Sequence, residues 1–365
     1  MTRRFTILAL SVVSTVSTLL LNPTDAYATK AQYAQEASTG IIALNSNWYS
    51  QETGLWDGAW WQSANALTTL ADFAQLQPTA ATALRISNII QNTFNNAPKK
   101  FPGFLNNFYD DEGWWALGLI HSYDATGDEG YLETAESIFK DMQTGGGTPC
   151  KGGIFSSKDR KNVDAIANEL YIAVAAALAN RIPSNRQYGQ IAVSGWKWFQ
   201  TSGLINSQNL INDGLNGTCG NNGLQTWSVN QGVILGALVE LSKASLLGGS
   251  VLVTARTLAK AAIKALSNPN GILVEVDKCE TQASACGFDA KQFKGVFIRN
   301  LGYLNQVIGD PDIRTFILNN ADSVWIKDRD SNNRMGVAWT GPVIGVNGAS
   351  DGSALDALVA ATRVA

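Results

Sequence analysis

The chain has 365 residues, of which 45% are hydrophobic and 16% charged, a composition typical of a soluble globular protein rather than a disordered or fibrous one. Its formal net charge of −3 leaves no excess of basic side chains to neutralise phosphates, so nucleic acid is not expected as a partner.

The first 28 residues have the pattern of a secretory signal peptide. Arg3 and Arg4 precede an apolar stretch over 5–21, and Ala26-Tyr27-Ala28 forms a small-x-small cleavage site. A membrane anchor is the alternative, but Ser and Thr residues interrupt the apolar stretch and the cleavage site follows it directly. Residues 355–365 carry no long apolar tail of the kind that directs a lipid anchor. We therefore expect residues 29–365 to be a secreted, extracellular monomer with no membrane anchor.

Beyond residue 28, apolar residues recur at helical spacing between Gly, Asn and Pro punctuation, and strand-like alternation is scarce. This pattern predicts a single all-α domain over 29–365. Helices are expected over 30–47, 61–77, 81–96, 111–127, 129–142, 164–182, 185–202, 227–246, 250–267, 289–308, 311–327 and 350–363.

Every second predicted helix has a face of small residues, and the intervening helices carry more charge. The small-faced helices start near 61, 111, 164, 227, 289 and 350, a spacing of roughly fifty to sixty residues that indicates a repeated hairpin. Six hairpins would close into an (α/α)6 barrel, with the small-faced helices inside. A linear helical solenoid is the alternative, but its repeats are typically shorter and more regular. Closure would bring the starts of the inner helices to one central cleft.

Asp110 and Asp111 stand at the start of the fourth predicted helix, beside Tyr109, Trp114 and Trp115. Acidic residues at a helix start are usually caps, and capping alone would explain this pair. The aromatic neighbours favour another interpretation, because the C–H faces of sugar rings stack on aromatic faces. Glycosidic cleavage also needs two carboxyl groups, one charged and one protonated.

Mutual repulsion would raise the pKa of one of these carboxyl groups, while the helix N-terminus favours the charged form of the other. Side chains on adjacent residues reach the ~5–5.5 Å carboxyl separation of retaining enzymes more easily than the wider inverting gap. We therefore interpret Asp110 and Asp111 as the catalytic pair of a retaining glycosidase.

Aromatic, amide and charged side chains recur near the starts of the inner helices, where they could stack on sugar rings or hydrogen-bond sugar hydroxyls. A cap or a loop hydrogen bond is the simpler interpretation of any one of them, and only their recurrence at one barrel end favours binding. The candidate substrate-binding residues are Trp61, Tyr109, Trp114, Asn162, Asn168, Glu169, Trp227, Asn230, Gln231, Lys294, Arg299 and Asp351.

Four cysteines form an even set that an oxidising compartment would pair. Cys279 and Cys286 are close enough for a local bridge, which leaves Cys150 with Cys219. Zinc is the alternative, but Cys-x-x-Cys spacing is absent and His121 is the only histidine. We expect two disulfides, no metal site and no cofactor. A sequon at Asn216 predicts glycosylation there.

Four motifs in matching order resemble glycoside hydrolase family 76, which comprises endo-α-1,6-mannanases and related fungal cell-wall mannosidase-like proteins. They are YDDEGWW over 109–115, Lys161-Asn162 with ANEL over 167–170, NQGVILGA over 230–237 and QFKGVFIRN over 292–300. The resemblance implies an (α/α)6 barrel and a substrate with α-1,6-linked mannose, the backbone of yeast and fungal mannan. It also implies that Asp110 is the nucleophile and Asp111 the general acid/base.

Two other functions stay open. Some relatives of the family are anchored cell-wall transglycosylases that act on lipid-anchor glycans, and transfer shares its intermediate with hydrolysis. A catalytically silent mannan-binding protein is the third hypothesis, although a silent relative would have no need to keep both aspartates.

Overall fold

The computed structural model describes residues 27–244, 247–282 and 286–365, so the expected signal peptide lies almost wholly outside the described residues. The described ranges are predominantly helical. No helix within them is long and apolar enough to span a bilayer.

The helices are α1 Lys30–Trp48, α2 Trp61–Leu76, α3 Pro78–Ala83, α4 Ile86–Asn96, α5 Tyr109–Thr126, α6 Glu129–Met142, α7 Ala165–Arg181, α8 Arg186–Thr201, α9 Ser228–Lys243, α10 Ser250–Leu266, α11 Ala290–Ile308, α12 Pro311–Lys327 and α13 Gly348–Val364. Two short antiparallel ribbons pair β1 Tyr49–Ser50 with β2 Leu55–Trp56, and β3 Val163–Asp164 with β4 Gly214–Leu215.

The helices follow the predicted order, with one split. The helix expected over 81–96 is two helices, α3 and α4, because Arg85 between them has a left-handed φ of 55° that interrupts the helical hydrogen bonds. Helix α5 starts at Tyr109, two residues before the predicted start at 111.

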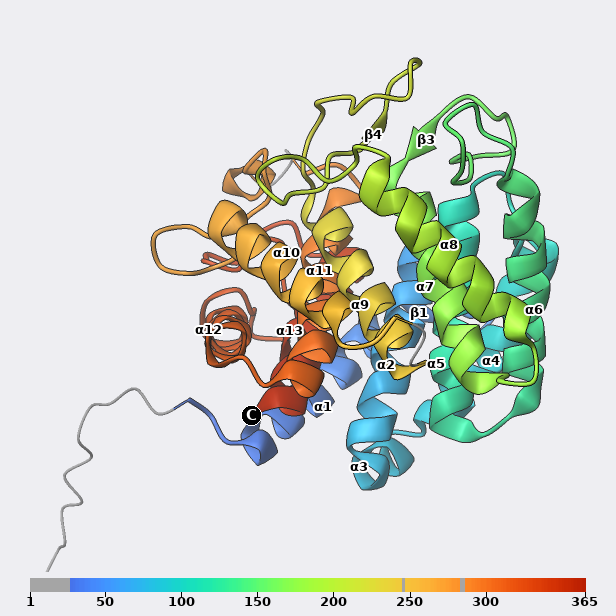
Figure 1. The fold of residues 1–365 in the computed structure, drawn as a ribbon. Helices are drawn as coiled ribbons and strands as arrows, with labels where there is room; N and C mark the ends of the chain where they lie inside the picture. The colour runs from blue at the N-terminus through green and yellow to red at the C-terminus, as the bar shows by residue number, and fades with distance from the viewer. Residues whose placement is uncertain (1–26, 245–246, 283–285) are drawn as a thin grey trace, which may run out of the picture.

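The helices form the (α/α)6 barrel that the repeat predicted. In the inner ring α2, α5, α7, α9, α11 and α13 each pack against the next, and α13 closes the ring by packing against α2. The outer helices α4, α6, α8, α10 and α12 cover this ring, and α1, blue in Figure 1, lies against the red α13. The first and last helices of the described residues therefore meet, as closure of a barrel requires.

Small residues explain why the inner helices approach so closely. A Cβ added to Gly295 of α11 would lie 2.5 Å from the Cα of Ser353 on α13, and one added to Gly232 of α9 would lie 2.7 Å from the Cα of Phe297. Real Cβ atoms do not come this close to backbone, so these positions require glycine.

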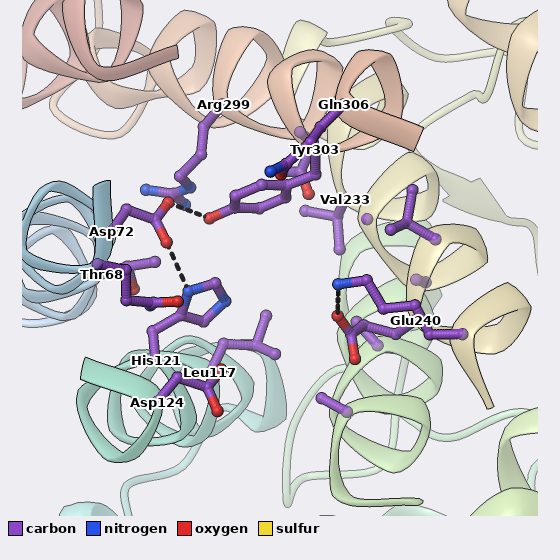
Figure 2. A pocket seen from close by; sticks show the side chains of 18 of the residues that line it. Thr68, Asp72, Leu117, His121, Asp124, Val233, Glu240, Arg299, Tyr303 and Gln306 are labelled. Carbon is purple, nitrogen blue, oxygen red and sulfur yellow. Dashed lines mark hydrogen bonds and ion pairs between the residues drawn. The ribbon is translucent and has the colours of Figure 1, made fainter. Parts of the chain in front are cut away.

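The barrel end that holds the C-terminal turns of the inner helices is closed by ion pairs around a narrow cavity. Asp72 of α2 accepts hydrogen bonds from His121 at 2.8 Å and from Tyr303 on α11 (Figure 2). On the other side, Glu240 of α9 pairs with Arg181 of α7 at 2.7 Å. Charged side chains thus tie these helices together at the end away from the predicted cleft.

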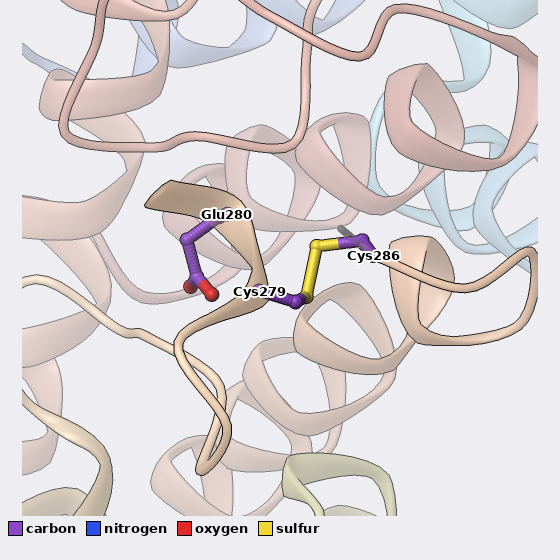
Figure 3. Close-up of side chains that lie close together, drawn as sticks. All are labelled: Cys279, Glu280 and Cys286. Atoms are coloured by element: carbon purple, nitrogen blue, oxygen red, sulfur yellow. A yellow bond between two sulfur atoms is a disulfide. The ribbon is translucent and has the colours of Figure 1, made fainter. Parts of the chain in front are cut away.

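Both expected disulfides are present. Cys150 pairs with Cys219 and joins two loops 69 residues apart in sequence, and Cys279 pairs with Cys286. Figure 3 shows Glu280 beside the second bridge. Because both sulfurs are bonded to each other, this group offers a metal no thiolate, and Glu280 pairs instead with Lys294 at 3.1 Å.

Candidate active site

The N-terminal ends of five inner helices surround one cleft of about 380 Å³. The sequence repeat predicted this convergence. Each helix contributes residues of its first turns, and the loops before α5, α9 and α11 complete the wall. The lining residues are Trp61, Phe108, Asp110, Asp111, Trp114, Ile166, Asp213, Trp227, Val229, Asn230, Asp289 and Phe293.

Three consecutive acidic residues at the start of α5 have different surroundings. Asp110 and Asp111 are half-buried and line the cleft. Glu112 is fully buried and pairs with Lys158 at 2.8 Å, away from the cleft. Side chains on adjacent helical residues diverge by about 100°, so a run of three cannot face one side. Two of these three consecutive carboxyl groups therefore face the cleft.

Asn106 holds one member of this pair. Its amide nitrogen donates to Asp111 Oδ2 at 2.6 Å, and its amide oxygen accepts from the backbone N–H of Phe108 at 2.9 Å. Asp110 Oδ1 is buried and has no hydrogen-bond partner among the described residues. The carboxyl group of Asp111 is therefore fixed, and that of Asp110 has an oxygen free for a ligand.

The pair binds protons more tightly than ordinary aspartates do. Burial, followed by repulsion from Asp111 and Asp164, raises the pKa of Asp110 well above its usual value. Burial raises the pKa of Asp111 to about 6, although the hydrogen bond from Asn106 opposes the rise. Two carboxyl groups this close titrate as a unit and keep one proton near neutral pH. Such a pair can supply one carboxylate and one carboxylic acid.

Aromatic rings form the walls beside the acids. Trp61 of α2 stacks on Trp114 of α5, with ring centroids 5.6 Å apart and planes at 25°. Phe293 of α11 lies between Trp61 and Trp227, at 6.2 and 5.8 Å from their ring centroids. Such a surface suits the C–H face of a pyranose ring. The acids and the rings together can hold a sugar chain across a reactive bond.

Of the residues that the sequence predicts to bind substrate, the structure places Trp61, Trp114, Trp227 and Asn230 in this cleft. The ring of Tyr109 is buried against Gly145 instead, with its hydroxyl 3.0 Å from Thr144.

The candidates at the start of α7 also lie outside the cleft. Asn162 is exposed, and its backbone carbonyl accepts from Ser156. Asn168 is buried, and its amide bonds the backbone of Ile154. Glu169 is fully buried in the barrel wall, where burial raises the pKa of its carboxyl group well above the usual value.

Gln231 and Lys294 hold neighbouring loops rather than line the cleft. Gln231 binds the backbone N–H and carbonyl of Ile211 at 2.9 and 2.8 Å. Lys294 donates to the carbonyl of Val337 at 2.7 Å. Each lies on an inner helix one position after a residue that lines the cleft, so its side chain points into the wall.

Arg299 and Asp351 also lie outside the cleft lining. Arg299 pairs with Asp356 at 3.2 Å and lines the cavity at the opposite barrel end, because it lies more than a helical turn past Phe293. Asp351 accepts from Trp48 Nε1 and from the backbone N–H of Met335, both at 3.1 Å.

Several lining residues were not among the sequence candidates. Phe293 stands inside the motif over 292–300 and Phe108 directly precedes the motif over 109–115, so their aromatic character was a usable signal. Asp213 lies in an irregular loop, which the pairing of β3 with β4 and the hydrogen bond from Ala165 N–H to the Asp213 carbonyl bring to the cleft. Asp289 comes just before α11, where capping was the ordinary interpretation.

The fold has close relatives among solved structures, although a search of curated protein sequences gives no significant match. The α-1,6-mannanase GH76A of Salegentibacter sp. HEL1_6 superposes with a TM-score of 0.80 at 20% identity, covering 91% of this chain and 100% of that one. Its inactive variant with two consecutive aspartates replaced by asparagine, in complex with α-1,6-mannotriose, superposes with a TM-score of 0.79 at 18% identity, covering 91% and 100%.

A fungal protein has the same fold. Dfg5 from Chaetomium thermophilum, in complex with glucosamine, superposes with a TM-score of 0.78 at 16% identity, covering 93% of this chain and 91% of that one. These likenesses establish the barrel. The model of glycosyl hydrolase family 76 matches residues 26–364, and the chain therefore belongs to that family.

Proposed function

We propose that this protein is a secreted endo-α-1,6-mannanase that cleaves the backbone of mannan with retention of configuration. The observation that carries the proposal is the Asp110–Asp111 pair, which lies in an aromatic-walled cleft where burial raises the pKa of both carboxyl groups. The comparisons support it, since a family relative of the same fold binds α-1,6-mannotriose and is inactive as a variant with two consecutive aspartates replaced.

The two aspartates have different roles in the cleavage, which takes place in two steps. Asp110, as carboxylate, attacks the anomeric carbon of a mannosyl unit, and the bond from that carbon to the O6 of the next unit breaks. Asp111 gives its proton to the departing O6. Water then attacks the same carbon, Asp111 takes a proton from that water, and Asp110 leaves as carboxylate.

This division requires the proton to lie on Asp111 when the reaction starts. In the free protein, burial and then repulsion from Asp111 and Asp164 favour the protonated form of Asp110. A bound glycosidic oxygen beside Asp111 gives the proton a new acceptor there. Binding of substrate is therefore part of how the pair reaches its reactive state.

Incubation with unbranched α-1,6-mannan and mass analysis of the products tests the proposal. Wild-type protein should release oligosaccharides of several lengths, as endo cleavage does. Asp110→Asn and Asp111→Asn should each lower kcat at least a thousandfold, whereas Asp312→Asn on the outer helix α12 should not. Substrate binding without released reducing ends would leave a silent mannan-binding protein instead.

Transglycosylation is the second candidate, because Dfg5 has the same fold. Transfer differs from hydrolysis only in the acceptor, which is a sugar hydroxyl instead of water. Incubation with an added acceptor oligosaccharide separates the two reactions, since products longer than the substrate form only by transfer.

A further inference from the structure

An exposed carboxylate at the rim of the cleft joins two inner helices that are not neighbours in the ring. Asp289, just before α11, accepts hydrogen bonds from Trp61 Nε1 at 2.7 Å and from Gln62 Nε2 at 3.0 Å. Both donors belong to the first turn of α2, and α13 lies between the two helices in the ring. The start of α11 is thereby tied to the start of α2.

The ring that Asp289 holds is part of the cleft wall. Trp61 stacks on Trp114, which follows the aspartate pair on α5 by about one turn. An indole without its N–H partner can rotate about two side-chain bonds. The hydrogen bond from Trp61 Nε1 to Asp289 therefore fixes the angle of a sugar-stacking surface beside the reacting groups, and the bond from Gln62 holds Asp289 in place.

The charge of Asp289 also acts on the pair. Asp111 is surrounded by Asp110 on its own turn, Asp289 from α11, and Lys100 with the neutral Asn106 from the segment before α5. Burial has the largest effect on the pKa of Asp111 and raises it, and the hydrogen bond from Asn106 opposes this rise. The negative charge of Asp289 raises the pKa further, whereas the positive charge of Lys100 lowers it. On the far side, Asp164 raises the pKa of Asp110. Asp213 is the remaining acid of the cleft.

We propose that Asp289 is a positioning residue of the cleft: its carboxylate holds the Trp61 indole against Trp114, and its negative charge, in the same cleft as Asp111, favours the protonated form of Asp111. This inference rests on the proposed function, in which Asp111 is the proton donor. It gives Asp289 two separable roles, one by hydrogen bonding and one by charge.

Three variants separate the roles. Asp289→Asn keeps an oxygen to accept from Trp61 but removes the charge, Trp61→Phe removes the hydrogen bond but keeps the charge, and Asp289→Ala removes both. Asp312→Asn removes an equal charge from a side chain of α12 that is 78% exposed. The pH profile of kcat/KM on α-1,6-mannan should be measured at low ionic strength, because salt screens an exposed charge.

Asp289→Asn should move the whole profile to lower pH by roughly half a unit and lower kcat, with KM nearly unchanged. Trp61→Phe should raise KM about tenfold with an unmoved profile. Asp289→Ala should show both effects, and Asp312→Asn neither. An unmoved profile in Asp289→Asn overturns the charge role, and an unchanged KM in Asp289→Ala overturns the positioning role.

A crystal structure of Asp289→Ala tests the positioning role without any substrate. The Trp61 indole should leave its stacked position on Trp114, and an indole in place would overturn that role. If the wild-type protein releases no products from mannan, the proposed function fails while this structural test still decides the role of Asp289 in holding Trp61.

Discussion

Arg181 and Glu240 form an ion pair of 2.7 Å that joins α7 to α9 at the barrel end opposite the aspartate pair. Arg181 also pairs with Asp124 of α5. Burial alone would raise the pKa of Glu240, but Arg181 and Lys243 outweigh it and lower this pKa to about 2. A carboxyl group with a depressed pKa stabilises the fold above its unfolded-state value, and this stabilisation is lost as the pH falls through the folded-state value.

Replacing Glu240 by Gln should therefore lower the free energy of unfolding by about 2–3 kcal/mol at pH 7. The difference from wild type should shrink between about pH 4.5 and pH 2, where the wild-type carboxyl group becomes protonated. Urea unfolding at several pH values measures it, with the exposed Glu129→Gln as control. A difference that is constant over this range would contradict the role of the ion pair.

Gly295→Ala should destabilise the barrel by about 2–3 kcal/mol, because the added methyl group would overlap the backbone of Ser353 on α13. Gly287→Ala is a matched control, since a Cβ there meets no atom of the described residues within 4 Å. Thermal unfolding of both variants tests the prediction. Equal melting temperatures would show that α11 and α13 can move apart at little cost.

The two disulfides should differ in their contribution to stability. Cys150–Cys219 closes a loop of 69 residues and Cys279–Cys286 one of 7. In the chain-entropy model, removing the first by Ser substitution should cost about 4 kcal/mol and removing the second about 2 kcal/mol. Denaturant unfolding of the two double variants gives the comparison, and an equal loss would indicate that loop length does not govern the effect here.

As the pH is lowered, activity should begin to decline at a higher pH than it would with an ordinary aspartate. The pair needs one carboxylate, and the raised pKa of Asp111, about 6, marks where the second proton binds. We expect kcat/KM on α-1,6-mannan to decline below about pH 6 rather than near pH 4, the region of an ordinary aspartate. A profile that is flat down to pH 4.5 would contradict this assignment.

Phe108 and Tyr109 are adjacent, yet only Phe108 should matter for substrate binding. Phe108 is 53% exposed and lines the cleft, whereas Tyr109 is buried with its hydroxyl beside Thr144. Phe108→Ala should raise KM roughly three- to tenfold by removing a stacking surface. Tyr109→Phe should leave kcat and KM within about twofold of wild type, because no contact with the cleft is lost. Steady-state kinetics on mannan measures kcat and KM of both variants. A larger effect of Tyr109→Phe than of Phe108→Ala would refute this placement.

The sequence alone determined the repeat and the class of fold. Helical spacing of apolar residues and small residues on alternate helices are local properties, so they predicted the barrel, its closure and the order of nearly every helix. The number and spacing of the cysteines predicted both disulfide pairs, and the start of α5 pointed to Asp110 and Asp111. The sequence did not predict the division of the helix expected over 81–96 into α3 and α4, because the hydrophobic pattern does not reveal a single left-handed residue such as Arg85.

Only the tertiary structure decided which residues of each inner helix face the cleft. A helix turns by 100° per residue, so Asn230 lines the cleft while its neighbour Gln231 binds a loop, and the two look alike in sequence. Asp213 and Asp289 reach the cleft through contacts with segments distant in sequence, which no local pattern encodes. Local sequence patterns determine the helices, whereas the site forms only where the N-terminal ends of the inner helices converge in the folded barrel.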